Sequence, residues 1–234
     1  MKQARKYFLF ALAIVVVDQI VKVIVKTNMM IGERIPLLGN WFKIQFIENP
    51  GAAFGLKVTS FFGSMSEDTG KIILTVFSLL ALGGIIYFLL KMASQRSAFP
   101  WFLAMILGGA LGNIIDRTFY GAIFSDINEY DGGLFFGRVV DMFYFDLFDL
   151  PLPGFMGGGT YHLWPIFNVA DAAITIGILV VLLFQSRFIR QHELAIKGLV
   201  STDDLADASL AQMPQEPAKD DSLTESPNES EIPS

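Results

Sequence analysis

Hydrophobic residues gather in four stretches of this chain, each about 20 residues long. A helix of that length crosses the hydrocarbon core of a bilayer, because the core is about 30 Å thick and a helix rises about 1.5 Å per residue. The four stretches cover residues 7–26, 71–90, 100–120 and 168–188. The pattern therefore predicts an all-α membrane protein with four transmembrane helices.

Basic residues in the flanks predict the orientation of these helices. Lys2 precedes the first span, Lys91 lies between the second and third, and Arg190 follows the fourth. Cytoplasmic flanks carry an excess of Lys and Arg, so we expect both termini inside and the loops 27–70 and 121–167 outside. A cleaved signal peptide in place of the first span is the alternative. No Ala-x-Ala-like cleavage site follows that run, so we expect the span to be retained.

The two external loops have patterns of their own. Residues 42–46 (FKIQF) alternate between apolar and polar, which is the period of a half-buried strand. Turn-forming residues stand on both sides, with Gly39-Asn40 before and Asn49-Pro50-Gly51 after. The loop 121–167 is rich in Phe, Tyr and Gly, which suits aromatic rings at the headgroup level. We expect a small sheet on the outer membrane surface and an interfacial segment beside it.

Composition supports a membrane protein and separates its C-terminal tail. Hydrophobic residues make up 53% of the chain and charged residues 17%, and the mean hydropathy of +0.49 is too high for an ordinary soluble domain. The net charge of -6 is uneven, because residues 201–234 hold nine acidic residues and one lysine. We expect residues 1–200 to form the membrane domain and residues 201–234 a disordered, acidic cytoplasmic tail. The lack of cysteine excludes a thiol nucleophile, and no long basic run suggests nucleic-acid binding.

Four aspartates lie inside or beside the apolar stretches: Asp18, Asp116, Asp141 and Asp171. A carboxylate at the centre of a membrane helix costs about 2.5–3.5 kcal/mol even on insertion scales, so such residues mark candidate functional sites. Counting along the predicted helices places Asp18 at or beyond the midplane and Asp116 near the outer edge. Asp171 falls in the first turn of the last span, and Asp141 in the external loop. All four are expected in one pocket in the outer half of the bilayer.

Ion pairing offers a structural explanation for two of these aspartates. Asp18 lies four residues before Lys22, a spacing that brings two side chains together on one helix face. Asp116 directly precedes Arg117 at a helix end, where a local carboxylate–guanidinium network is expected. For both residues, structural support or substrate positioning is a better interpretation than direct catalysis.

The other two aspartates are less easily explained by structure alone. Asp171 follows Asn168 by three residues, the spacing of a helix cap with an acidic residue in the first turn, so capping is an alternative role. Asp141 has only Arg138 as a nearby basic residue, and its strand-like neighbours would direct it to one face.

Two facing carboxylates would give the chemistry of an aspartic protease, in which one keeps its proton and the ionised partner activates a water. A metalloprotease is not indicated, because His162 and His192 form no HExxH motif. A serine hydrolase is not indicated either, because the sequence has no GxSxG motif. Two other classes stay open. A small transporter or ion-conducting protein would use buried aspartates as relays through the whole membrane depth, and a non-catalytic assembly factor would use the external aromatic loops for binding.

Five ordered motifs resemble those of the bacterial lipoprotein signal peptidases, also called type II or prolipoprotein signal peptidases. The motifs are Asp18-Gln19 with Lys22, residues 49–55 (NPGAAFG), 108–117 (GGALGNIIDR), 139–143 (VVDMF) and 167–171 (FNVAD). The resemblance covers about residues 7–190. It implies an aspartic endopeptidase of the inner membrane that removes signal peptides from lipid-modified prolipoproteins. Cleavage would occur before the diacylglyceryl cysteine, at the periplasmic face.

The resemblance also implies roles for individual residues. Asp141 and Asp171 match the catalytic pair of the family. The remaining matched positions are expected to bind substrate or support the pair, and they are Asp18, Lys22, Asn49, Gly51, Asn113, Asp116, Arg117 and Asn168. The family fold adds a small extracytoplasmic β-cradle and an interfacial loop over the active site to four helices. The implied partners are lipidated signal peptides and membrane lipids, with no nucleic acid, no metal or cofactor, and a monomeric enzyme.

The loops depart from the family pattern. The segments on either side of Asp141 look longer than usual and include a Gly-rich insert at residues 154–159 (GFMGGG), so the architecture over the site is expected to differ. The glycines of the third span, Gly108, Gly109 and Gly112, are interpreted as points of close helix packing.

Overall fold

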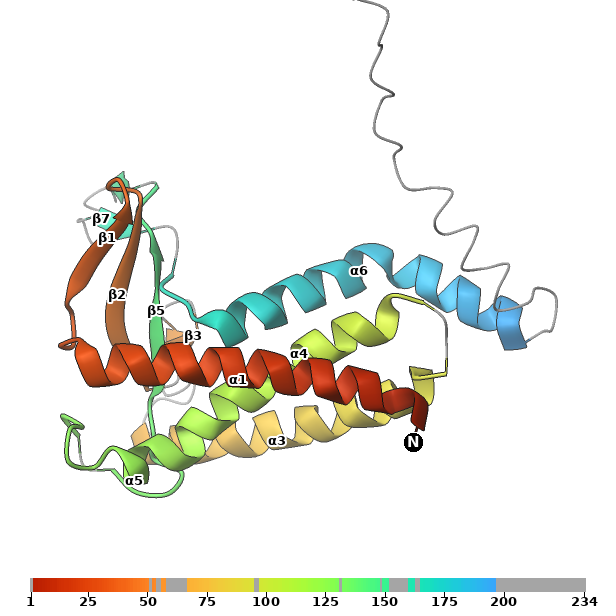
Figure 1. The fold of residues 1–234 in the computed structure, drawn as a ribbon, viewed down its shortest axis with the longest axis horizontal. Coiled ribbons are helices and arrows are strands. Elements are labelled where there is room, and N and C mark those ends of the chain that lie inside the picture. Colours follow the sequence, from red (N-terminus) through yellow and green to blue (C-terminus); the bar gives the residue numbers. More distant parts are fainter. Residues whose placement is uncertain are drawn as a thin grey trace, which may run out of the picture.

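Four long helices lie alongside one another in the described part of the chain, and a small sheet stands at one end of them (Figure 1). The computed structural model describes residues 2–50, 52–53, 56–57, 67–94, 97–130, 132–147, 149–151, 160–162 and 165–196. The helices are α1 (Arg5–Asn28), α3 (Glu67–Met92), α4 (Phe99–Ile115) and α6 (Val169–Ile196), with a short 3-10 turn, Lys2–Ala4, before α1. Gly51, the insert 154–159 and the tail 201–234 lie outside the described residues.

Three of these helices are long and apolar enough to cross a membrane, namely Arg5–Asn28, Ile72–Met92 and Phe99–Ile123. The first part of α6, Val169–Phe184, forms a shorter apolar segment. Large apolar side chains point outward from these helices, and Leu80 is 71% exposed. An outer surface of this kind suits a hydrocarbon environment. The predicted helical segments are therefore confirmed, with three membrane-span candidates among the described residues.

Helix α4 packs against α1, α3 and α6, and glycines allow the closest of these contacts. A Cβ atom on Gly108 would lie 2.7 Å from the backbone oxygen of Ala11 in α1. A Cβ atom on Gly109 would collide with the backbone oxygen of Ala170 in α6. Because these backbones touch, only glycine fits, and the interpretation of these two residues as packing positions is confirmed.

The third predicted span is not a uniform α-helix. After Ile115 the chain forms a π-helical turn, Asp116–Tyr120, followed by a short helix α5 (Gly121–Ile123). A π turn leaves backbone carbonyls free, and the carbonyl of Arg117 accepts a hydrogen bond from the amide of Gly137 at 3.0 Å. A Cβ atom on Gly137 would collide with the Asp116 carbonyl, so glycine permits this contact. The loop before the last sheet strand is thus fixed to the end of α4.

The sheet has three antiparallel strands in the order β1 (Arg34–Leu38), β2 (Phe42–Asn49) and β5 (Val139–Phe145). Strand β2 contains the predicted alternating segment, and Gly39 in the preceding turn has a φ of +55°. Two small two-stranded pairs complete the described strands: β3 (Ala52–Ala53) with β4 (Leu56–Lys57), and β6 (Asp149–Pro151) with β7 (Thr160–His162).

Alternation along β5 separates an apolar face from a polar one. Val140 and Met142 are fully buried and pack in a cluster with Val25 of α1 and Phe46 of β2. Asp141 therefore points to the opposite face of the strand. The position of this strand at the end of the helices brings that face to the polar site.

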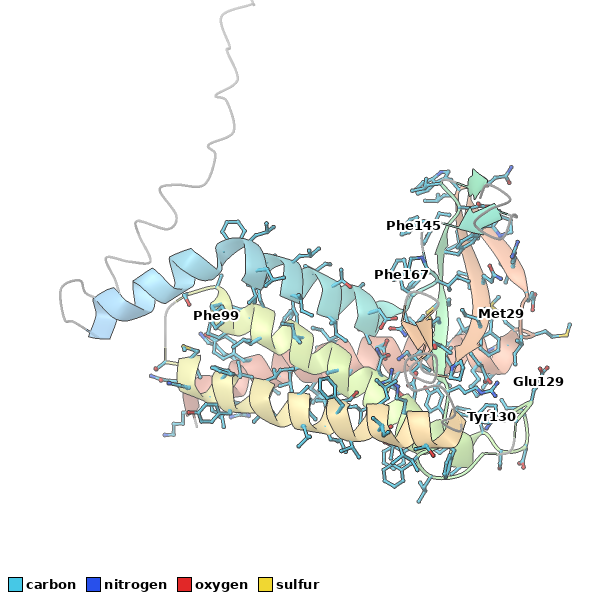
Figure 2. All side chains as sticks on the ribbon, turned by 180° about the vertical axis from the view of Figure 1, so that it is seen from behind. Met29, Phe99, Glu129, Tyr130, Phe145 and Phe167 are labelled. Carbon is cyan, nitrogen blue, oxygen red and sulfur yellow. The ribbon has the colours of Figure 1, made fainter. Side chains whose placement is uncertain are left out.

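A backbone bridge links this strand to the start of α6. The amide of Phe143 donates to the carbonyl of Phe167 at 2.7 Å, and the amide of Phe167 donates to the carbonyl of Phe143 at 3.1 Å. The centres of the two rings lie 5.7 Å apart. Phe167 is labelled in Figure 2, between the sheet and the helix that follows. Because Asn168 directly follows Phe167, this bridge places the first turn of α6 beside Asp141.

Candidate functional site

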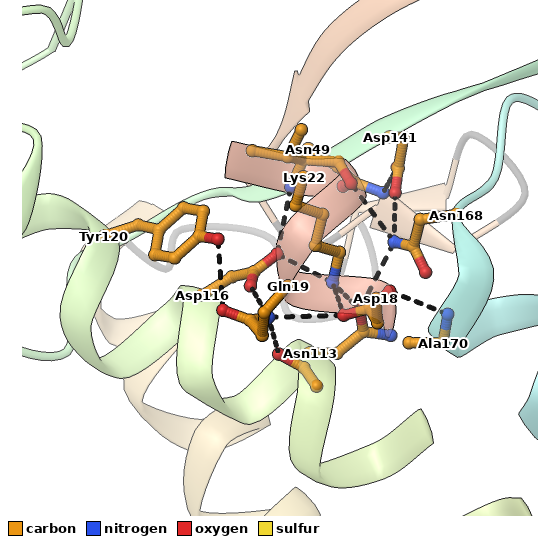
Figure 3. Close-up of polar contacts among 12 residues, drawn as sticks. Asp18, Gln19, Lys22, Asn49, Asn113, Asp116, Tyr120, Asp141, Asn168 and Ala170 are labelled. Atoms are coloured by element: carbon orange, nitrogen blue, oxygen red, sulfur yellow. Dashed lines mark hydrogen bonds and ion pairs between the residues drawn. The ribbon is translucent and has the colours of Figure 1, made fainter. Parts of the chain in front are cut away.

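Polar side chains from α1, α4, β2, β5 and α6 meet where the sheet touches the helices (Figure 3). All four aspartates predicted to converge belong to one hydrogen-bonded network there, and Asp18, Asp116 and Asp141 are at most 1% exposed. Other buried members of the network are Lys22, Asn113 and Asn168.

Lys22 is the buried cation at the centre of this network. Its Nζ lies 2.8 Å from Asp18 Oδ2 and 2.8 Å from Asp116 Oδ2, and it donates a hydrogen bond to Asn113 Oδ1 at 2.9 Å. The predicted pairing of Asp18 with Lys22 is therefore confirmed. One ammonium group links a carboxylate of α1 to one at the end of α4, and all three side chains are fully buried.

Among the described residues, Asp116 and Arg117 form no direct ion pair, although Arg117 lies within electrostatic reach of Asp116. Asp116 forms its ion pair with Lys22, whereas Arg117 donates a hydrogen bond to Ser78 Oγ of α3 at 3.3 Å. Consecutive residues on a helix point in different directions, so their side chains do not face each other.

Gln19 is a member of the site that the sequence motifs named without giving it a role. Its Nε2 donates to Asp116 Oδ1 at 2.8 Å and to Asp18 Oδ2 at 3.2 Å. Tyr120 donates from its hydroxyl to Gln19 Oε1 at 3.1 Å, which fixes the orientation of the amide. A second polar residue beside Asp18 in an apolar run was the available signal for Gln19. Tyr120 gave none, because it reads as an ordinary interfacial aromatic.

Asp18 and Asp116 each hold the backbone beside one of the other two aspartates. Asp18 Oδ1 accepts a hydrogen bond from the amide of Ala170 at 2.9 Å. Asp116 Oδ2 accepts one from the amide of Val140 at 3.2 Å. Ala170 directly precedes Asp171, and Val140 directly precedes Asp141. Asp18 therefore helps to position Asp171, and Asp116 helps to position Asp141.

The start of α6 is closed by a reciprocal cap. The amide of Asp171 donates to Asn168 Oδ1 at 2.8 Å, and the amide of Asn168 donates to Asp171 Oδ2 at 3.3 Å. The predicted helix cap is confirmed. Capping does not use the whole side chain, because Asp171 Oδ1 accepts a further hydrogen bond from Asn113 Nδ2 at 2.8 Å.

Asp141 is held by two amide side chains on opposite sides. Asn168 Nδ2 donates to its Oδ1 at 2.6 Å, and Asn49 Nδ2 donates to its Oδ2 at 3.1 Å. Burial, and then the negative charge of Asp171, raise the pKa of Asp141 to about 7. The two aspartates therefore share Asn168 as a hydrogen-bond partner and influence each other electrostatically.

Two neighbouring negative charges in a buried site repel each other, so a pair of this kind favours the form in which one carboxyl group is protonated. Such a pair can activate a water and protonate a reacting group in turn. Within the described ranges, no group of three or more Asp, Glu or His side chains is arranged to hold a metal ion.

The chain is similar in sequence to one family of known proteins. Residues 10–187 match the model of a protein family described as signal peptidase (SPase) II. The chain is 39% identical over 191 residues to a protein of Porphyromonas gingivalis named lipoprotein signal peptidase, covering 74% of this chain and 80% of that protein. It is 37% identical over 200 residues to a protein of the same name from Amoebophilus asiaticus, covering 81% of each.

A solved structure described as a bacterial membrane enzyme is also similar, with a TM-score of 0.52 and 28% identity. The match covers 77% of this chain and 88% of that structure. The helices and the sheet beside them are therefore an arrangement already seen in a membrane enzyme.

Proposed function

This chain belongs to the signal peptidase II family, and we propose that it removes signal peptides from lipid-modified prolipoproteins as an aspartic endopeptidase. The observation that best supports this function is the coupling of Asp141 to Asp171. Asn168 bonds to both residues, and burial, followed by the charge of Asp171, raises the pKa of Asp141 to about 7. The peptide bond to be cut is the one before the diacylglyceryl cysteine.

Asp141 and Asp171 are the catalytic pair in this proposal. The ionised carboxylate of the pair removes a proton from the attacking water, while the protonated carboxyl polarises the scissile carbonyl. The amides of Asn49 and Asn168 and the N-terminus of α6 favour the ionised form, whereas burial opposes it. The two residues titrate as a unit, so the roles belong to the pair.

The remaining polar residues position this pair. Asp18 holds the backbone next to Asp171, and Asp116 holds the backbone next to Asp141. The Lys22 ammonium balances the negative charges of Asp18 and Asp116. Asn113, Asn49 and Asn168 donate to the catalytic carboxylates. Arg117 is assigned to the same group, because its strongest electrostatic partner is Asp171, followed by Asp116 and Asp141. Gly51 is proposed as a further substrate-binding residue from its motif.

The proposed membrane arrangement adds α6 to the three span candidates, giving four transmembrane helices in the inner membrane. Basic flanks support cytoplasmic termini, and the sheet that contains Asp141 stands at the end of the helices opposite the N-terminus (Figure 1). The active site would therefore lie near the periplasmic face, with the sheet and the aromatic loop at the lipid headgroups. Residues 1–200 would form a monomeric peptidase domain, and residues 201–234 a cytoplasmic tail.

A transporter is not favoured, because the buried polar residues gather at one end of the helices. The other end is filled by an apolar cluster from α1, α3 and α4 that includes Tyr7, Ala11, Leu89, Leu103 and Leu107. An ion relay requires polar groups through the whole membrane depth. In the described helices, this half offers no fully buried charged side chain.

The proposal is tested with purified protein in detergent and one precursor in two forms. The first form carries a diacylglyceryl group on the cysteine after the signal peptide, and the second lacks the lipid. We expect cleavage directly before the cysteine of the lipidated form and little cleavage of the other. Failure to cut the lipidated precursor, with ion flux through the same protein in liposomes, would overturn the peptidase proposal in favour of transport.

A further inference from the structure

A second buried ion pair lies outside the network around Lys22. Lys26 of α1 pairs with Glu48 Oε1 of β2, and both side chains are 2% exposed. The Lys26 ammonium also lies 5.4 Å from the ring centre of Phe124 and 6.0 Å from that of Phe46. Neither Lys26 nor Glu48 has a role in the proposed reaction.

The pair continues a row of charged side chains along one face of α1. Asp18, Lys22 and Lys26 are spaced four residues apart, which places them one above another on the helix. Lys22 connects this face to Asp116 of the π turn that follows α4, whereas Lys26 connects it to Glu48 of β2. The same helix therefore positions two different parts of the site.

Glu48 directly precedes Asn49, the last residue of β2. Neighbouring residues in a strand point to opposite faces, so Glu48 faces Lys26 while Asn49 faces Asp141. The strand register supports this, because Glu48 is opposite Val140, which lies on the face away from Asp141. The ion pair thus fixes the strand end from which Asn49 donates to Asp141 Oδ2 at 3.1 Å.

Stability alone does not explain this pair. Glu48 Oε2 is buried and has no hydrogen-bond partner among the described residues, so the carboxylate is held through one oxygen only. Burying two charges costs free energy that their attraction does not reliably return, and an unsatisfied oxygen adds to that cost. We therefore look for the role of this ion pair in the position that it gives to the end of β2.

We propose that the Lys26–Glu48 ion pair is a positioning device that keeps the Asn49 amide against Asp141. The inference rests on the proposed function, because it assigns these residues to the same catalytic pair. In this role Lys26 and Glu48 act on the catalytic pair through Asn49.

Other charged groups around both ends have to be separated from this effect. Asp141 is faced by Asp171 of α6, Lys22 of α1 and Arg117 of the π turn. Glu48 lies within electrostatic reach of Tyr130, which is labelled in Figure 2 in the loop before β5. Since all of these stay unchanged in the variants below, a shift in the pH profile reports on Asn49.

The test removes both charges together, so that no buried charge is left alone. The double variant Lys26→Met with Glu48→Gln is compared with Asn49→Ala and with a control on the same sheet. The control is Lys43→Met with Asp146→Asn, which removes a more exposed ion pair at the other end of β2. The lipidated precursor is cleaved at pH values from 5 to 9, and kcat and KM are measured separately.

We expect the double variant to lower kcat by about tenfold or more with little change in KM. Its pH profile should move to higher pH by about half to one unit, as in Asn49→Ala, because a hydrogen bond to the charged form of Asp141 is lost. Adding Asn49→Ala to the double variant should cause no further loss. The control pair should leave kcat and the profile unchanged.

An accumulated double variant with the kcat and pH profile of the unchanged protein would overturn the proposal, while the proposed function would stand. If that variant does not accumulate, Glu48→Asp keeps the charge and shortens the side chain. A lower kcat with a shifted pH profile then supports the proposal, and an unchanged enzyme overturns it. Lack of cleavage by the unchanged protein would instead contradict the proposed function itself.

Discussion

Asn168 allows two roles of one side chain to be separated. Its Nδ2 donates to Asp141 Oδ1 at 2.6 Å, and its Oδ1 accepts the amide of Asp171 at 2.8 Å as a helix cap. Asn168→Ser keeps a capping oxygen but loses the donor to Asp141. Asn168→Ala loses both.

The magnitudes follow from these two contacts. A hydrogen bond to a charged group contributes about 1.5–3 kcal/mol, which corresponds to about 10- to 100-fold in rate if it is lost in the transition state. A helix cap contributes about 1 kcal/mol, which lowers the melting temperature of a protein of this size by about 2–4 °C. Both variants also lose the weaker bonds from Asn168 to Val140 and Asn113, so that loss cancels in their comparison.

The assay combines cleavage of the lipidated precursor with thermal unfolding in detergent. We expect equal losses of kcat in Asn168→Ser and Asn168→Ala, and a melting temperature a few degrees lower in the Ala variant only. A Ser variant with full activity would refute the role of Asn168 in holding Asp141. Equal melting temperatures in the two variants would refute its role as a cap.

Three further outcomes are expected from the structure. Lys22→Met leaves two buried carboxylates without their cation and should destabilise the protein by about 3–5 kcal/mol. This corresponds to a fall of roughly 10 °C in the melting temperature. Lys91→Met, at an exposed position, should change the melting temperature little. Burial and the charge of its partner raise the pKa of Asp141 from 3.8 to about 7, so the folded protein binds this proton more tightly than the unfolded chain. The stability it contributes is complete below about pH 4 and is lost as the pH rises through 7, so unfolding should occur at lower temperature at pH 8 than at pH 5, and Asp141→Asn should flatten this difference. Gly109→Ala should cost about 1–3 kcal/mol, measured by thermal unfolding, because its methyl group would collide with the backbone of Ala170.

Local patterns in the sequence predicted the parts of the site that local forces decide. The alternation at residues 42–46 predicted β2, and the spacing of Asn168 and Asp171 predicted the cap of α6. The four-residue spacing of Asp18 and Lys22 predicted their ion pair. Each of these depends on a short repeat of the backbone, which is readable without knowledge of the fold.

Contacts between distant segments could not be predicted in the same way. The partner of Asp116 is Lys22, 94 positions away, and that choice depends on how α1 and α4 pack. The π-helical turn after Ile115 has no sequence signature, yet it sets the direction of Arg117 and frees a carbonyl for the loop that follows. Such features follow from tertiary packing.

Depth along the helices was the most useful long-range argument. Rise per residue placed Asp18 and Asp116 in the outer half of the bilayer, on the same side as Asp141 and Asp171, and the structure joins all four in one network. Helix depth alone does not identify the backbone amides of Val140 and Ala170 as partners of Asp116 and Asp18, because the positions of these amides depend on the strand register and the helix start.

Single-turnover cleavage of the lipidated precursor by Asp141→Asn and Asp171→Asn tests directly whether these two residues, the proposed catalytic pair, cut the peptide bond together. Asp126→Asn, at an exposed position, is the matched control. We predict a loss of about 10³-fold or more in each catalytic variant, no further loss when both are combined, and full activity in the control. Cleavage at the unchanged rate by either catalytic variant, in protein that accumulates normally, would contradict the account.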